Sequence, residues 1–102
     1  MDVDEASARE QRQFLLMLER LRGFRGRSVP LPRLIADLEG LLLALEITPE
    51  KWREAFNEQW IALEVPYAVA LDRLDPLPTL DDVDIADAID ALEALVVERL
   101  GT

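Results

Sequence analysis

The chain has 102 residues, half of them apolar, and its 21 acidic residues outnumber 11 basic ones for a net charge of −10. It has no cysteine and no histidine, which excludes disulfides, thiolate and Ser-His-Asp catalysis, and the commonest metal sites. The negative charge opposes binding to nucleic acid or to an anionic membrane, because phosphate groups would be repelled.

Composition predicts an all-α fold. Leu and Ala supply most of the apolar residues and both favour helix, whereas alternating runs of Val, Ile and Thr are missing. We expect one domain over residues 1–102, a small bundle of about four mostly antiparallel helices. The N-terminus is acidic where a signal peptide would be basic, and apolar runs are far shorter than the roughly 20 residues of a membrane span. We therefore expect a cytoplasmic protein.

The first helix is predicted to begin near Asp4 or Ser7 and to end at residues 23–25. Its apolar stripe at helical spacing comprises Phe14, Met17, Leu18, Leu21 and Phe24. Leu15 and Leu16 lie off this stripe. Either the helix is wedged between several neighbours, or these two leucines face a second chain.

A basic loop follows. Five arginines and no acidic residue occur between residues 20 and 33, namely Arg20, Arg22, Arg25, Arg27 and Arg33. Nucleic-acid binding is disfavoured, because only Phe24 could stack on a base. The expected state is a solvated or internally paired loop.

The second helix is predicted from about Pro32 to Glu46, with a wide apolar face centred on Leu34, Leu38, Leu41 and Leu45. Gly40 lies off that face. It either permits close approach of a neighbour or is tolerated at a cost of about 1 kcal/mol.

The third helix carries most of the aromatic residues. Thr48 is its expected N-cap and Pro49 its first residue. An apolar stripe then keeps helical spacing through Trp52, Phe56, Trp60, Leu63, Tyr67, Ala70 and Leu74. Pro66 falls inside the helix without disturbing the phase of this stripe, so we predict one helix kinked at Pro66.

Thr79 is predicted to cap the fourth helix, with Asp82 in the capping-box position. Its buried stripe would be Ile85, Ile89, Leu92, Val96 and Leu100. Residues 76–98 contain seven acidic residues and no Lys or Arg. Asp84, Asp87, Asp90 and Glu98 lie opposite the apolar stripe and should face water.

This acidic face needs an explanation, because like charges at helical spacing repel by a few tenths of a kcal/mol per pair. Solvent and salt could screen it, the basic loop of a second copy could dock on it, or a basic partner protein could bind it. Charge asymmetry along the chain permits docking: residues 1–33 hold seven arginines and five acids, whereas residues 34–102 hold four basic and sixteen acidic residues.

Catalytic chemistry has little support. The aspartates of the fourth helix do not have EF-hand spacing, and a dimetal bundle would need histidine. Glu39, Glu46 and Glu64 are the remaining carboxylates for a metal-dependent hydrolase, but they lack a paired motif. We expect no enzymatic activity, no metal and no cofactor.

The central run Asp37-Leu38-Glu39, Trp52, Phe56, residues 60–64 and Tyr67-Ala68 resembles small acidic all-α bacterial proteins that confer immunity to polymorphic toxins. The resemblance covers residues 30–75. Such proteins neutralise a toxin by covering its active site. For this chain, the resemblance implies that the acidic fourth helix faces the toxin.

The sequence thus favours a non-enzymatic module that binds a basic protein. Its candidate partner-binding residues are Asp81, Asp82, Asp84, Asp87, Asp90 and Glu98. The alternative is a structural or adaptor homodimer, for which the candidate contacts are Leu15, Leu16, Leu43, Arg25 and Arg27. A carboxylate-metal hydrolase ranks third.

Overall fold

Residues 3–101 fold as four helices connected by short loops. The computed structural model describes the backbone of residues 3–101 and the side chains of residues 5–101. Its helices are α1 (Val3–Arg25), α2 (Leu31–Leu43), α3 (Glu50–Arg73) and α4 (Val83–Arg99), and no strand occurs in that range. The prediction of an all-α bundle is confirmed.

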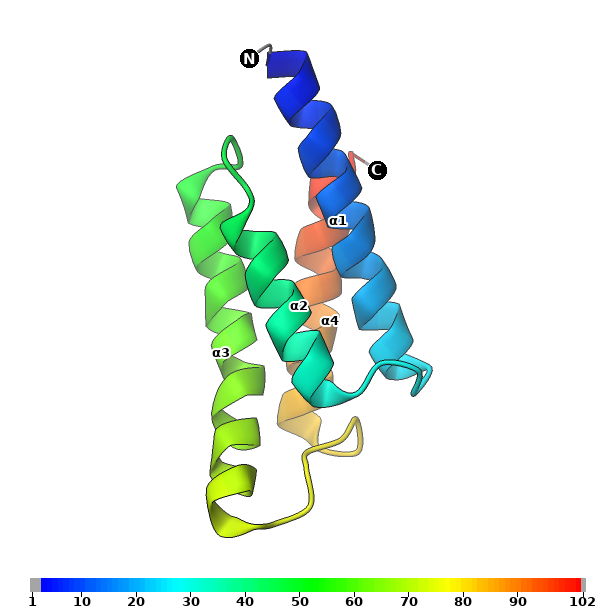
Figure 1. Cartoon of the computed structure of the whole chain (residues 1–102), viewed down its shortest axis with the longest axis vertical. Helices are drawn as coiled ribbons and strands as arrows, with labels where there is room; N and C mark the ends of the chain where they lie inside the picture. The colour runs from blue at the N-terminus through cyan, green and yellow to red at the C-terminus, as the bar shows by residue number, and fades with distance from the viewer. Residues whose placement is uncertain (1–2, 102) are drawn as a thin grey trace.

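Successive helices run in opposite directions around a closed ring (Figure 1). α1 packs against α2 and α4, and α3 packs against the same two helices from the other side. The molecule measures 48 × 23 × 18 Å, so the helices lie along its length. This up-and-down arrangement follows from the short loops, which can join only adjacent antiparallel helices.

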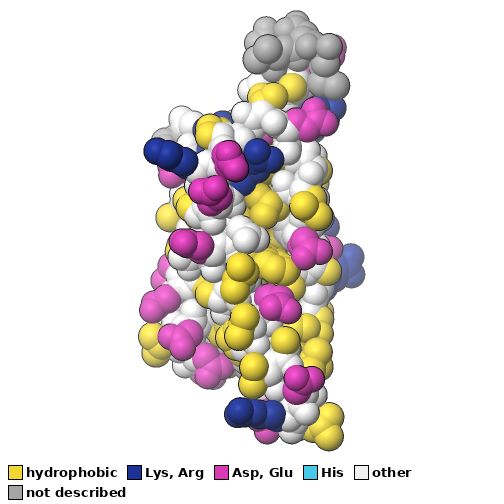
Figure 2. Space-filling view, turned by 90° about the vertical axis from the view of Figure 1, so that its left-hand side faces the viewer, with side chains coloured by type: hydrophobic (Ala, Val, Ile, Leu, Met, Phe, Trp, Pro, Cys, Tyr) yellow, Lys and Arg dark blue, Asp and Glu magenta, His cyan; other side chains and the backbone are white. Residues whose placement is uncertain are grey.

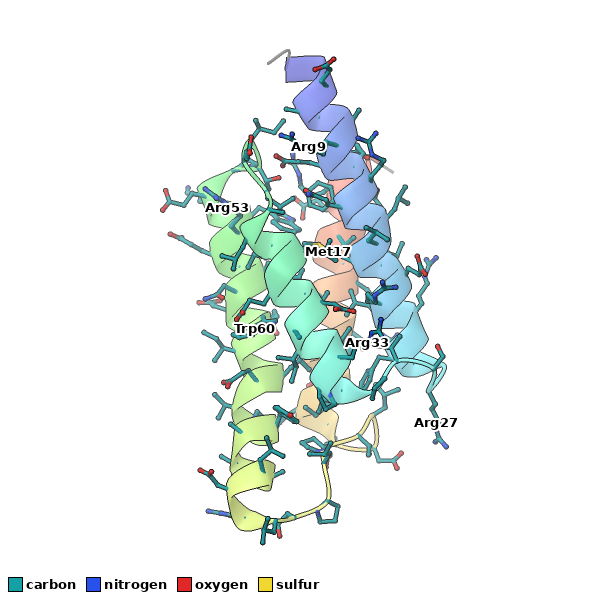
Figure 3. The ribbon with its side chains drawn as sticks, viewed as in Figure 1. Arg9, Met17, Arg27, Arg33, Arg53 and Trp60 are labelled. Atoms are coloured by element: carbon teal, nitrogen blue, oxygen red, sulfur yellow. The ribbon has the colours of Figure 1, made fainter. Side chains whose placement is uncertain are left out.

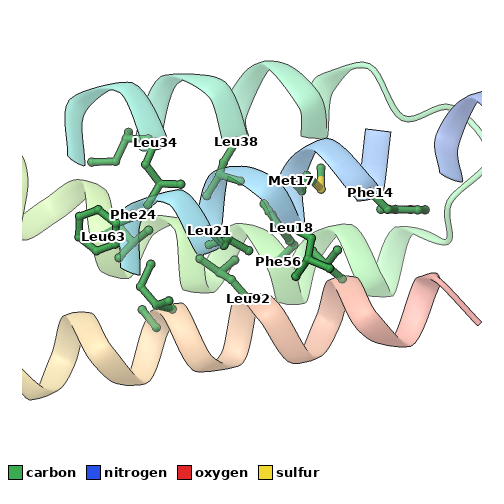
Figure 4. Packing of buried hydrophobic residues seen from close by; sticks show 14 of the residues in the cluster. Phe14, Met17, Leu18, Leu21, Phe24, Leu34, Leu38, Phe56, Leu63 and Leu92 are labelled. Atoms are coloured by element: carbon green, nitrogen blue, oxygen red, sulfur yellow. The ribbon is translucent and has the colours of Figure 1, made fainter. Parts of the chain in front are cut away.

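The core is built from the apolar stripes of all four helices (Figure 4). Its central side chains have at most 1% of their surface exposed, and include Phe14, Met17, Leu21, Leu34, Leu38, Phe56, Leu63, Ile89 and Leu92. Burying each of them contributes about 1.5–3 kcal/mol relative to exposure. The buried stripes predicted for the first and fourth helices are found, except that Leu100 is only half-buried.

The two tryptophans of α3 form hydrogen bonds to the neighbouring helices. Trp52 donates its indole N–H to the carbonyl of Leu95 in α4 at 2.9 Å, and Trp60 donates to the carbonyl of Ile35 in α2 at 2.8 Å (Figure 3). The Trp52 ring also packs between Phe14 and Phe56, with centroids 5.3 and 5.2 Å away. The aromatic stripe therefore belongs to the core.

α3 continues through Pro66 as one helix, as predicted. A bend at that residue stays a prediction. The prediction that the buried stripe extends to Leu74 is wrong, because Leu74 is 92% exposed. Leu74 adopts left-handed backbone angles, and the Asp75 N–H bonds back to the Ala70 carbonyl at 2.9 Å, which closes the helix and turns Leu74 outward.

The predicted start of α3 and end of α2 are both wrong, and one residue explains both. Glu10 of α1 is only 2% exposed and accepts hydrogen bonds from the N–H groups of Glu46 and Ile47 at 2.7 and 2.8 Å. It also accepts a short bond from the Thr48 hydroxyl. The chain leaves the helix at Leu43 to reach this carboxylate, and Thr48 bonds to Glu10 instead of capping α3.

The predicted start of α4 at Thr79 is also wrong, because the helix begins at Val83 with Asp82 as N-cap. The expected local bonds do form. The Thr79 N–H donates to the Asp82 carboxylate at 2.9 Å, and the Thr79 hydroxyl oxygen accepts the Asp81 N–H at 3.2 Å. They close a turn ahead of the helix.

Candidate functional site

The most distinctive surface is a shallow groove between the second half of α3 and the first turns of α4. It consists of two hollows of about 460 and 560 Å³ that lie next to each other, with Pro66 and Asp84 lining both. Residues of the α3–α4 connection close one end of the larger hollow. We call this surface the α3–α4 groove.

One wall of the groove is an exposed apolar stripe. Ile61, Val65 and Val69 recur every four residues along α3 and are 43%, 49% and 43% exposed. This stripe is separate from the buried stripe of the same helix. This stripe was not predicted from the sequence, although its four-residue spacing indicates a second apolar face of the helix.

The groove is also lined by acidic residues. Glu58, Asp84 and Asp87 line the smaller hollow, Asp75, Asp82 and Asp84 line the larger one, and no Lys or Arg is among the described residues that line either. Figure 2 looks at the side on which α3 lies and shows hydrophobic side chains down the middle of this face, with Asp and Glu on both sides. The groove therefore combines an apolar stripe with negative charge.

The six predicted partner-binding residues do not form one surface. Asp84 and Asp87 are exposed and lie together in the groove, and Asp82 lies at its end with its carboxylate bonded to the Thr79 N–H. Asp81 instead lines a separate pocket of about 500 Å³ between the α1–α2 and α3–α4 connections, with Arg27. Glu98 is exposed near the other end of α4 and lines neither hollow.

Asp90 is already paired within the chain. Arg25 donates through Nε to Glu93 at 2.5 Å and makes a short bond to Asp90. The bonds to Glu93 and Asp90 raise the pKa of the Arg25 guanidinium above its ordinary value. The basic loop thus relieves part of the acidic face in its own chain, which makes docking by the loop of a second copy unnecessary for Asp90.

The predicted self-association residues are scattered. Leu16 lies beside a hollow between α1 and α2, Leu43 lines one between α2 and α3, and Leu15 lines no pocket described here. All three are exposed, by 40%, 77% and 56% respectively. The Arg27 side chain extends away from the molecule (Figure 3). These residues do not make a continuous apolar patch.

Two further properties concern the described residues only. No three acidic side chains among them converge closely enough to hold a metal ion. In residues 3–101, no helix combines the length and the apolar character needed to cross a bilayer.

The groove is therefore the feature from which a function can be argued. Comparisons with protein-family models, with curated proteins and with solved structures found no match.

Proposed function

We propose that this protein is a non-enzymatic binding module that holds a basic protein partner in the α3–α4 groove. The observation that carries this proposal is the pairing of the Ile61–Val65–Val69 stripe with the carboxylates of Asp84 and Asp87. Apolar contact supplies binding free energy when water is excluded. Complementary charge at the rim speeds encounter and selects against acidic proteins.

Whole-molecule charge supports the same partner chemistry. A net charge of −10 repels anionic ligands and attracts cationic ones over about a Debye length, roughly 8 Å at physiological salt. Neutralisation of a basic toxin, which the resemblance to immunity proteins implies, is one form of this function. In that form the groove would cover a cationic surface of the toxin.

Affinity capture with matched charge variants tests the proposal. The Asp84→Lys/Asp87→Lys variant reverses the groove, and the Glu39→Lys/Asp72→Lys control makes the same change in net charge at exposed residues outside it. We expect proteins retained by the wild type and the control to be lost by the groove variant. A purified candidate should then show at least about tenfold weaker binding to the groove variant.

Two results would count against this function. Equal loss with both variants would mean that only the total charge of the molecule matters. Equal retention by all three proteins would mean that the groove is not the binding surface. Circular dichroism of each variant establishes that the helices are intact, which is expected because all four substituted residues are exposed.

A further inference from the structure

We infer that the occupant of the α3–α4 groove is a basic amphipathic α-helix, which lies along the groove as a fifth helix of the bundle. This inference rests on the proposed function and adds the conformation and the residue pattern of the partner segment. Its apolar residues would contact the stripe of α3, and its Lys or Arg residues would face the aspartates of α4.

The other common modes of peptide recognition lack their structural requirements here. Strand addition needs an exposed sheet edge, and residues 3–101 contain no strand. Recognition of a proline-rich segment needs an aromatic groove, and no aromatic side chain is among the described residues that line either hollow. A helix placed in a groove between two helices is the mode that remains.

The spacing of the groove residues matches a helix. Ile61 and Val69 lie eight positions apart in α3, with Val65 midway, which is about 12 Å at 1.5 Å per residue. Asp84 and Asp87 are about 4.5 Å apart along the axis of α4 by the same measure. A partner helix therefore needs apolar residues over two turns on one face and cations one turn apart beside them.

Pro66 lies beside the stripe and lines both hollows. Glu58 lines the smaller hollow with it. A Lys or Arg side chain of the partner helix would have the Glu58 carboxylate as a counter-ion at this end of the groove.

Two copies of this chain cannot pair groove to groove without charge repulsion. Every copy carries the net charge of −10, and its groove presents the same carboxylates. Two such surfaces would repel each other. The basic residues of another protein satisfy the charge requirement.

The test uses a designed peptide of about five helical turns, in which Leu recurs every three or four residues and Lys fills the other positions. Its control has the same composition in an order that places no Leu stripe on one face. We expect the first peptide to gain helix by circular dichroism on binding and to shift the amide signals of α3 and α4. The control peptide should bind about tenfold more weakly or not at all.

Matched protein variants locate the contact. Val65→Ser/Val69→Ser removes most of the apolar stripe, whereas Leu15→Ser/Leu71→Ser removes similarly exposed side chains that line neither hollow. We expect about tenfold weaker peptide binding for the first pair and less than about twofold for the second. Unfolding curves of both variants serve as the check on folding.

The outcomes separate this inference from the function on which it rests. If a captured partner depends on Asp84, Asp87, Val65 and Val69 but the designed peptide gains no helix on binding, the helix inference is wrong and the proposed function is retained. The helix inference is also wrong if the designed peptide and its reordered control bind equally, or if neither binds. If the Glu39→Lys/Asp72→Lys control also loses partner capture, both the helix inference and the proposed function are wrong.

Discussion

At the scale of single residues, the buried carboxylate of Glu10 stabilises the fold, although the chain already carries an excess of negative charge. Burial by itself would raise the pKa of its carboxyl group, but the bonds donated by Ile47, Thr48 and Glu46 outweigh this effect and lower the pKa below its ordinary value of 4.5. Glu10 therefore joins α1 to the α2–α3 connection as an anion. It fixes where α2 ends.

Replacing this residue tests that role. Glu10→Gln should lower the free energy of unfolding by about 1–3 kcal/mol at neutral pH, because bonds to a buried anion are lost. Since the pKa of Glu10 is lower in the folded protein, the carboxylate stabilises the fold above its unfolded pKa, and this contribution disappears as the pH falls. Urea unfolding should thus show a smaller difference between wild type and variant near pH 3 than at pH 7.

The exposed residue Glu39 supplies the control for this experiment. It makes none of the side-chain hydrogen bonds described for Glu10, so Glu39→Gln should change the free energy of unfolding by less than about 0.5 kcal/mol. A Glu10→Gln effect that stays the same from pH 7 to pH 3 would contradict the proposed role of the anion.

Arg25 and Arg27 differ in partners although both lie at the end of α1 or just after it. Arg25→Ala should cost about 0.5–1 kcal/mol at low salt, because its bonds to Asp90 and Glu93 are surface ion pairs, and less in 1 M NaCl. Arg27→Ala should cost nearly nothing at either salt concentration. Chemical unfolding at both concentrations measures the difference, and equal effects of the two substitutions would contradict it.

At the scale of elements, periodicity predicted the existence, order and buried faces of the helices. It failed at their ends. α2 stops at Leu43 because a residue 33 positions earlier binds the next segment, and no local pattern around Leu43 contains that information. α4 starts at Val83, after the predicted Thr79. The predicted bonds between Thr79 and Asp82 do form, but they close a turn ahead of the helix.

The candidate site shows the same division. Asp84 and Asp87 were predicted as partner-binding residues from charge alone. Their exposure was predicted from their helical positions opposite the apolar stripe. The pairing of Asp90 with Arg25 could not be predicted, because it depends on how α1 lies against α4. The spacing of Ile61, Val65 and Val69 indicates an apolar face, but the aromatic stripe on the same helix is the stronger pattern in the sequence.

Pro66 provides the prediction at this scale. Pro66→Ala restores an N–H for the Ala62 carbonyl and removes the steric conflict of proline within a helix, which costs about 3 kcal/mol in full. Because the surrounding structure already accommodates the proline, we expect a smaller gain of about 1–2 kcal/mol in urea unfolding. Amide exchange near residue 66 should slow as well. A loss of stability would mean that packing of the residues after Pro66 requires the proline.

At the scale of the whole molecule, net charge should oppose folding. Ten excess negative charges are held within 48 × 23 × 18 Å, and unfolding lets them separate. The exposed ion pairs offset little of this repulsion, since each contributes at most about 1 kcal/mol. Salt weakens both effects, and the repulsion is the larger one.

We therefore expect the unfolding temperature to rise by about 4 °C or more between low and moderate NaCl concentration, which corresponds to about 1 kcal/mol for a domain of this size. The Glu39→Lys/Asp72→Lys variant, with less net charge, should show a smaller rise. Differential scanning calorimetry measures both. An unfolding temperature that falls with salt would mean that the ion pairs dominate. The same salt should weaken binding of a basic helix, so stability and partner binding would respond in opposite directions.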